Sequence, residues 1–287
     1  AGVKDTYENA KTYMDATIGD RVPEILKETY LKRGPEMLRF FHDNTKHMRF
    51  KYATNYSDYY AHLPGGKPTG RSIEPEIIDM RLLKEWEGLI LEPTLSTKGF
   101  TMTGQEFHKV NMIMRTLKGK ATSLKLGTRM IKSKLTGARY ASLGRALMAR
   151  MALSYKQAGG KFTVNAAFKD FIVENNRVIG VLIESNGKQL QIKANRGVIL
   201  GAGGFSQDQE KRQKYLPQPT NKEWTSSPAG QTGDIIEPCK KLGAKFDLME
   251  HVWGAPSVLD HHNKPFFLVA DRAIPSMIIV DQNGNRY

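Results

Sequence analysis

A short apolar run, GVIL at 197–200, leads directly into the glycines of GAGGF at 201–205. A strand buried in a sheet reads as an unbroken apolar run, and glycines at its carboxyl end let a ligand approach the backbone closely. The pattern indicates α/β architecture with a cofactor loop, although a tight strand-to-helix turn gives the same pattern. No G-x-G-x-x-G fingerprint precedes the run, so a free-standing dinucleotide site is not encoded.

The spacing of apolar residues changes near residue 160. Before that point it recurs every three to four residues, which predicts helices over 7–45 with breaks at Gly19 and Gly34, and again over 141–160. Residues 45–75 are rich in Gly, Pro, Tyr and Asp and are expected to form a long loop region. After residue 160 the period becomes two, which predicts strands at 161–165, 167–174, 177–185 and 188–195.

Turn signals divide the strand region. The pairs Asn175-Asn176 and Asn186-Gly187 predict the two turns of a β-meander. A helix, a meander and a buried strand together indicate the α/β class. The segment TGDIIEPCKKLGA predicts a further helix, and MIIVDQNGNRY predicts a strand followed by a turn whose second strand is absent. We therefore expect the chain to be an internal piece of a longer protein.

Composition excludes several classes of protein. The 287 residues include one cysteine, which excludes a disulfide framework and fits the reducing cytoplasm. No apolar run reaches the roughly 18 residues of a transmembrane helix, and the N-terminus lacks the layout of a signal peptide. His261-His262 lies in a turn-like segment without further ligands at metal spacing, so no metal site is expected.

The net charge of +14 is concentrated in one segment, because residues 108–139 contain no acidic residue. Apolar residues alternate with the basic ones there, which predicts one or two amphipathic helices. A solvated basic face, peripheral contact with an anionic membrane and contact with another acidic partner all remain open. Nucleic acid is not expected, since no zinc-finger, RNA-recognition or helix-turn-helix signature accompanies the charge.

Two loops carry residue types suited to chemistry. The stretch TNYSDYYAHLPGG at 54–66 holds Tyr56, Tyr59 and Tyr60, whose phenols could pack, bind a flat ligand or handle protons. The stretch SSPAGQTGD at 226–234 leads into a predicted helix, where free amides could bind an anion or a flavin. Thr232 or Asp234 could equally be the N-cap of that helix.

These segments together resemble the 3-ketosteroid Δ1-dehydrogenases, flavoproteins of the fumarate reductase and succinate dehydrogenase class. The motifs are YSDYYAHLPGGKPTGRSIEP, GRAL, AFKDFIVENNRVIGV, RGVILGAGGF, TGD and SMIIVDQNGNRY, and the resemblance covers essentially all of the chain. It implies a Rossmann-like FAD-binding domain over 1–252, with a helical insertion over about 1–140, and the start of a substrate domain over 253–287. The family's pyrophosphate-binding loop would lie upstream and the rest of its catalytic domain downstream.

The resemblance also implies a reaction and a set of site residues. The family removes hydrogens from C1 and C2 of a 3-ketosteroid, one as a hydride to FAD and one as a proton to a tyrosine-based system. Tyr59 matches the catalytic tyrosine, Tyr56 a substrate wall and Phe267 an aromatic lining position. Further partners implied are the steroid and an artificial or quinone-type electron acceptor. The positions carried over for the cofactor are Gly144, Phe168, Gly201, Ala202, Gly203, Gly204, Thr232, Gly233 and Asp234.

Two departures qualify the resemblance. Ile235 stands where the family usually has a glycine after TGD, and the 226–234 region lacks the histidine that fumarate-reducing relatives use. The second departure argues against a dicarboxylate substrate. The alternatives kept open are a relative in the same class acting on another enone or dicarboxylate, and a catalytically dead basic homologue.

Overall fold

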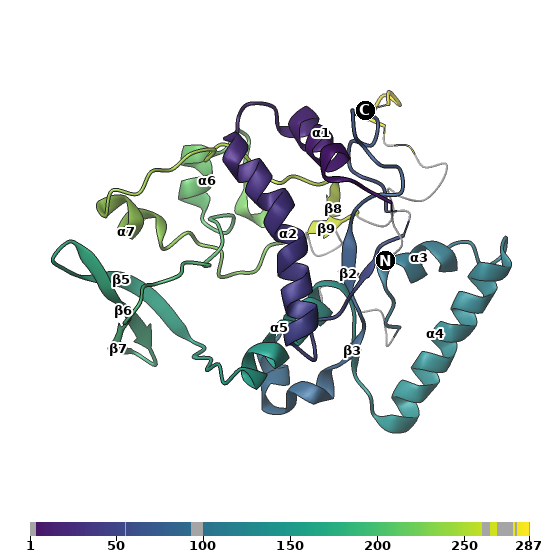
Figure 1. The fold of residues 1–287 in the computed structure, drawn as a ribbon, viewed down its shortest axis with the longest axis horizontal. Coiled ribbons are helices and arrows are strands. Elements are labelled where there is room, and N and C mark those ends of the chain that lie inside the picture. Colours follow the sequence, from purple (N-terminus) through teal and green to yellow (C-terminus); the bar gives the residue numbers. More distant parts are fainter. Residues whose placement is uncertain are drawn as a thin grey trace. The chain divides into compact units, whose positions relative to one another are not determined.

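The computed structural model describes residues 4–54, 56–92, 100–259, 265–268, 278 and 280–286. The chain divides into two compact units, Ala1–Lys161 and Phe162–Tyr287. Figure 1 shows the helices and strands of both units. The elements of the first unit are α1 (Tyr7–Ile18), α2 (Glu24–Asn44), β1 (Phe50–Tyr52), β2 (Ile73–Pro75), β3 (Ile78–Asp79), the 3-10 helix η1 (Met80–Leu89), α3 (Gly104–Val110), α4 (Leu117–Thr136), β4 (Tyr140–Ala141) and α5 (Leu143–Gln157).

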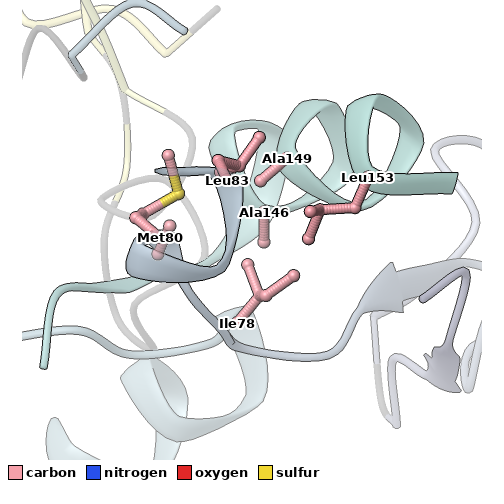
Figure 2. Close-up of a cluster of buried hydrophobic side chains, with 7 residues drawn as sticks. Ile78, Met80, Leu83, Ala146, Ala149 and Leu153 are labelled. Atoms are coloured by element: carbon pink, nitrogen blue, oxygen red, sulfur yellow. The ribbon is translucent and has the colours of Figure 1, made fainter. Parts of the chain in front are cut away.

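The core of the first unit lies between η1 and α5. Figure 2 shows Ile78, Met80 and Leu83 facing Ala146, Ala149 and Leu153. Met80, Leu83, Ala146 and Ala149 are fully buried. Small alanines on α5 let η1 approach closely, and burying each large side chain contributes about 2 kcal/mol. Ile78 joins this core from β3, which pairs antiparallel with β4.

Arg150 fixes α5 to the segment that precedes the core. Its buried guanidinium donates to the backbone carbonyls of His47, Glu76 and Ile77. A planar guanidinium with five donors can satisfy several carbonyls at once. Arg150 therefore has a structural role.

Glu106 fixes α4 to α3. Its carboxylate accepts hydrogen bonds from Nη1 and Nη2 of Arg129, both at 2.8 Å, and from the backbone N–H of Thr103 at 3.1 Å. Lys125 Nζ lies 3.1 Å from the same carboxylate. Burial alone would raise the pKa of Glu106, but the hydrogen bonds from Arg129, Thr103 and Lys125 lower it to about 2.

We expect Glu106→Gln to lower the free energy of unfolding by about 2 kcal/mol at neutral pH, because it removes charge-assisted hydrogen bonds. The pKa of Glu106 in the folded protein is about 2, below its ordinary value of 4.5. The carboxylate's contribution is therefore complete above about pH 4.5 and is lost as the pH falls toward 2. Urea unfolding of the complete protein at several pH values measures this. The exposed pair Arg33–Glu36 supplies the control Glu36→Gln. If the difference in unfolding free energy between the parent and Glu106→Gln is the same at pH 3 as at neutral pH, the assignment is wrong.

Two expectations for the first unit were wrong. Gly34 does not break the helix, since α2 continues through Gly34 and Pro35 to Asn44. Pro35 removes only one backbone hydrogen bond, and it lies on an exposed face where water can hydrate the freed carbonyl. The 45–75 segment is not a continuous loop, because its ends form β1 and β2, which pair antiparallel from Phe50 to Pro75. The expected helices in the basic segment are confirmed as part of α3 and as α4.

The second unit begins with the expected meander. Strands β5 (Ala166–Glu174), β6 (Arg177–Ser185) and β7 (Lys188–Lys193) pair antiparallel in chain order. Asn175 and Asn176 both have positive φ, as do Asn186 and Gly187. Two consecutive residues with positive φ are the signature of the two-residue hairpin turns that the sequence predicted. The remaining elements are α6 (Gln209–Tyr215), η2 (Lys222–Trp224), α7 (Ile236–Lys241), β8 (Ser257–Leu259) and β9 (Pro265–Phe267).

Two expected strands do not form. Residues 161–165 and 197–200 have no strand conformation, and Ile199 is 98% exposed. A strand of a parallel sheet requires hydrogen-bonded neighbours, and the described part of the chain supplies none for 197–200.

The Asn-Gly turn near the C-terminus does form, with the backbone N–H of Asp281 donating to the carbonyl of Asn285 at 2.8 Å. His261-His262, and Met277 and Ile279 of the strand expected before that turn, lie outside the described residues.

Candidate functional site

The tyrosine-bearing loop spans residues 53–72, between β1 and β2. Gly70 has a φ of +70°, and a Cβ there would lie 1.6 Å from the backbone oxygen of Tyr56. Any side chain at Gly70 would therefore force the two ends of the loop apart. Tyr52 Oη donates to the carbonyl of Gly70 at 3.2 Å. The loop is closed on itself at its base, which limits how Tyr56 can move.

Asp58 and Arg71 tie the middle of the loop together. Asp58 is largely buried, forms an ion pair with Arg71 and accepts from the backbone N–H of Lys67 at 2.9 Å. Arg71 also donates from Nε to Asp5 at 2.7 Å and from Nη2 to the carbonyl of Gly65 at 2.8 Å. These contacts hold Asp58, which lies between Tyr56 and Tyr59 in the chain, in place.

The loop also rests on α1. The Arg71 guanidinium lies 5.3 Å from the centre of the Tyr13 ring, within the range of a cation–π contact. The backbone N–H of Tyr60 donates to Tyr13 Oη at 3.1 Å. Tyr13 therefore contacts both the Arg71 clamp and the segment that carries the tyrosines.

Tyr56 and Tyr59 form a pair. Their phenolic oxygens are 3.4 Å apart, their ring centres 6.5 Å apart, and the rings meet edge to face at 87°. Tyr59 is 59% exposed. Two phenols at hydrogen-bond distance can share a proton, and edge-to-face rings offer a wall to a flat apolar molecule. Tyr60 is exposed and lies edge to face with His62.

The two glycine-bearing loops of the second unit lie side by side. A Cβ at Gly203 would lie 3.3 Å from the side chain of Gln231, and one at Gly233 would lie 2.7 Å from Cβ of Phe205. The backbone N–H of Gln207 donates to the carbonyl of Gln231 at 3.0 Å. The segments 201–205 and 231–233 are thus in direct contact. Their nearest ends, Phe205 and Gln231, are 26 positions apart in the chain.

A serine pair reinforces this contact. Ser206 Oγ and Ser227 Oγ are 2.5 Å apart, and Gln207 Nε2 donates to the carbonyl of Ser227 at 2.8 Å. Around positions 201 and 204 the space is open, since a Cβ at Gly201 or Gly204 would meet nothing within 4 Å. The backbone of 201–204 is exposed, so its amides are accessible to a ligand. This arrangement fits a cofactor that needs close backbone approach.

Thr232 and Asp234 interact with each other. Thr232 Oγ1 donates to Asp234 Oδ1 at 2.8 Å, and neither side chain caps α7, whose N-cap is Ile235 with no side-chain hydrogen bond. The N-cap reading of these residues is therefore wrong. Ile235 has a φ of −77°, which any residue adopts, so the backbone there does not require the glycine that the family usually carries.

Phe168, Gly144 and Phe267 lie apart from these loops in the chain. Phe168 lies on β5, where its ring centre is 4.9 Å from that of Phe171. Gly144 is the second residue of α5, in the first unit, and a Cβ there would meet nothing within 4 Å. Phe267 lies on β9, paired with Ser257 of β8. Ala202 belongs to the exposed 201–204 backbone.

Sequence reasoning missed the residues that support the tyrosines and the glycine loops. Asp58 and Arg71 lie within the quoted motif YSDYYAHLPGGKPTGRSIEP, and their opposite charges were the available signal. Nothing in the sequence indicates that Gln231 contacts Gly203. That contact depends on the tertiary structure of the second unit.

A family model described as FAD binding domain matches residues 1–287. The chain belongs to this FAD-binding domain family. It is 39% identical over 296 residues to the 3-oxosteroid 1-dehydrogenase of Mycolicibacterium smegmatis, covering 100% of this chain and 51% of the relative. It is 38% identical over 295 residues to the 3-oxosteroid 1-dehydrogenase of Mycobacterium tuberculosis, covering 100% of this chain and 52% of that protein. The chain thus spans about half the length of the curated relatives it matches.

A solved structure shares the fold. The 3-ketosteroid Δ1-dehydrogenase of Sterolibacterium denitrificans, in complex with 1,4-androstadiene-3,17-dione, matches with a TM-score of 0.86 and 30% identity, over 100% of this chain and 53% of that one. The comparison confirms the resemblance and the fold class expected from the sequence. FAD is the cofactor of the family, and the contacting glycine loops of the second unit fit it.

Proposed function

We propose that the complete protein is an FAD-dependent dehydrogenase that introduces a C1–C2 double bond into a 3-ketosteroid. The observation that carries the proposal is the 39% identity to a 3-oxosteroid 1-dehydrogenase across the whole of this chain. The paired phenols of Tyr56 and Tyr59 support it, because they are the groups that this chemistry needs.

The reaction separates two hydrogens by their chemistry. C2 is adjacent to the C3 carbonyl, so its hydrogen is acidic and leaves as a proton. The hydrogen on C1 leaves with its electron pair, and the electrons of the broken C2–H bond form the C1=C2 bond. FAD, when bound, supplies the acceptor for that hydride. The steroid is oxidised by two electrons, and one proton passes to the protein.

Tyr59 is the proposed proton acceptor. A phenol has a pKa of about 10 in water, so it needs help to hold negative charge near neutral pH. Tyr56, with its oxygen 3.4 Å away, can donate a hydrogen bond to Tyr59 and share that charge. The ion pair of Asp58 with Arg71 keeps the short segment between the two rings in one conformation, which preserves the alignment that proton transfer requires.

The cofactor assignments are part of the same proposal. Close backbone approach at the contacting glycine loops suits the flavin nucleotide, and the backbone of Phe168 and the start of α5 at Gly144 are further contacts. Thr232 and Asp234 flank the buried Gly233. Residues 201–204 carry the main contacts.

The remaining assignments concern the organisation of the complete protein. We assign residues 1–252 to the FAD-binding domain and 253–287 to the start of a substrate domain, in which Phe267 lines the steroid site. A quinone-type acceptor would reoxidise the flavin.

Turnover by the complete FAD-loaded protein tests the proposal. We expect it to convert androst-4-ene-3,17-dione to the 1,4-diene with an artificial electron acceptor, and to show no fumarate reduction with a reduced dye. The absence of a histidine in 226–234 predicts the second result. Fumarate reduction without steroid turnover would favour the dicarboxylate alternative, and inactivity in both assays with FAD bound would favour the dead homologue.

A further inference from the structure

Helix α4 exposes an apolar stripe along its whole length. Leu117, Leu124, Ile131 and Leu135 are 83%, 71%, 55% and 82% exposed. Together with the exposed Ala121 and Thr128 they are spaced alternately four and three residues apart. At about 100° per residue, all six fall within about 40° of one line along the helix. Four large aliphatic side chains in a row face solvent.

This stripe is not the face that packs on the rest of the first unit. Gly119 and Leu126 are the buried residues of α4, and they lie about 160–180° from the stripe around the helix. Arg129 fixes the packed side to Glu106 near the start of α3. Figure 1 shows α4 beside α3. The helix therefore has two apolar faces, and only one of them packs against the rest of the first unit.

Lysines border the stripe on both sides. Lys118, Lys125 and Lys132 lie about 60–100° to one side, and Lys120 and Lys134 lie about 60–100° to the other. Lys125 pairs with Glu106. Within the part of the chain that the structure describes, no carboxylate forms an ion pair with Lys118, Lys120, Lys132 or Lys134. The segment 108–139 has no acidic residue, so the charge around the stripe has one sign.

We propose that α4 lies flat on an anionic phospholipid membrane, with this stripe inserted between the lipids. Long lysine side chains on both flanks can reach out to lipid phosphates while their methylene stems stay beside the apolar residues. From Leu117 to Leu135 the helix extends about 27 Å along the surface. The proposal does not depend on the catalytic activity.

Other occupants fit the stripe less well. A second copy of α4 would bring lysines on both flanks against lysines, and like charges facing each other are repulsive. Spanning the bilayer is excluded for α4, because none of the helices in the described ranges combines the required length and apolarity. An acidic amphipathic helix of another protein is the alternative that the experiment must separate.

Sedimentation of the complete, FAD-loaded protein with vesicles tests the proposal. Vesicles of phosphatidylcholine alone are compared with vesicles that also contain about one-third phosphatidylglycerol, at about 0.1 M and 0.5 M salt. One variant carries Leu124→Gln and Leu135→Gln, at exposed positions that folding does not need. A second carries Lys→Gln at 118, 120, 132 and 134. The matched control carries Lys→Gln at the exposed positions 188, 193, 222 and 245, which changes the net charge equally.

We expect the parent and the control to bind the anionic vesicles, with binding weakened by salt. The leucine variant should lose at least about tenfold in affinity, because two inserted side chains are removed. Each lysine near an anionic surface strengthens binding about fivefold, so the variant that lacks four of them should lose several hundredfold in affinity.

Three results would overturn the proposal. The first is that the parent does not bind anionic vesicles, which would favour an acidic helix of another protein as the occupant of the stripe. The second is equal weakening of the control and the lysine variant, which would show a general charge effect. The third is vesicle binding that the leucine variant retains in full, which would show that the stripe does not enter the lipid.

Discussion

Tyr59→Phe in the complete protein should lower kcat for steroid dehydrogenation by about a hundredfold while FAD stays bound. Removing the phenol removes the proposed proton acceptor, and general acid–base groups typically contribute 10²–10⁴ in rate. The ring remains, so the wall that it forms with Tyr56 is kept and KM should change little. Steady-state turnover with an artificial acceptor measures the effect, and flavin absorbance reports cofactor retention.

Tyr60→Phe is the matched control for that experiment. Tyr60 is exposed next to Tyr59, and its contact with Tyr13 uses its backbone N–H. The control should keep nearly full activity. Tyr56→Phe should lose about tenfold, since it removes one hydrogen bond to the proposed phenolate. Equal kcat values for Tyr59→Phe and Tyr60→Phe would refute the role of Tyr59.

Gly233→Ala should weaken FAD binding by about tenfold or more. Gly233 has a φ of +66°, where an alanine costs about 1–2 kcal/mol, and its Cβ would lie 2.7 Å from Cβ of Phe205. Relieving that clash must separate the 231–233 segment from 201–205, and these two loops together form the proposed FAD-binding site. Titration of the flavin-free complete protein with FAD measures the dissociation constant.

Gly230→Ala lies in the same loop and is its control. Its φ is not positive and a Cβ there would meet nothing within 4 Å, so FAD should bind as in the parent. Thermal unfolding without FAD shows whether either variant loses its fold. If Gly233→Ala binds FAD as tightly as Gly230→Ala, the contact between the two loops does not support the cofactor.

Local signals in the sequence were enough to predict the meander. The pairs Asn175-Asn176 and Asn186-Gly187 adopt positive φ in the structure, because short polar side chains and glycine tolerate the left-handed region. The helices of the first unit follow from apolar spacing in the same way. The break expected at Gly34 was wrong, because a glycine inside a helix costs only about 1 kcal/mol and does not by itself end it.

Contacts between distant segments could not be read from the sequence. The apolar run 197–200 predicted a buried strand, but apolarity says only that a residue can be buried and not which strand pairs with it. The contact of Gly203 with Gln231 joins two such segments through tertiary structure. The tyrosines were identified by type and by resemblance, and the structure adds their pairing.

The comparison of steroid oxidation with fumarate reduction by the complete FAD-loaded protein tests the central claim most directly. Under anaerobic conditions one equivalent of androst-4-ene-3,17-dione should bleach the bound flavin and yield the 1,4-diene, with one hydrogen lost from C1 and one from C2. Mass spectrometry of substrate deuterated at each carbon identifies the two losses. A flavin that stays oxidised with the steroid, but is reoxidised by fumarate once reduced by a dye, would contradict the account.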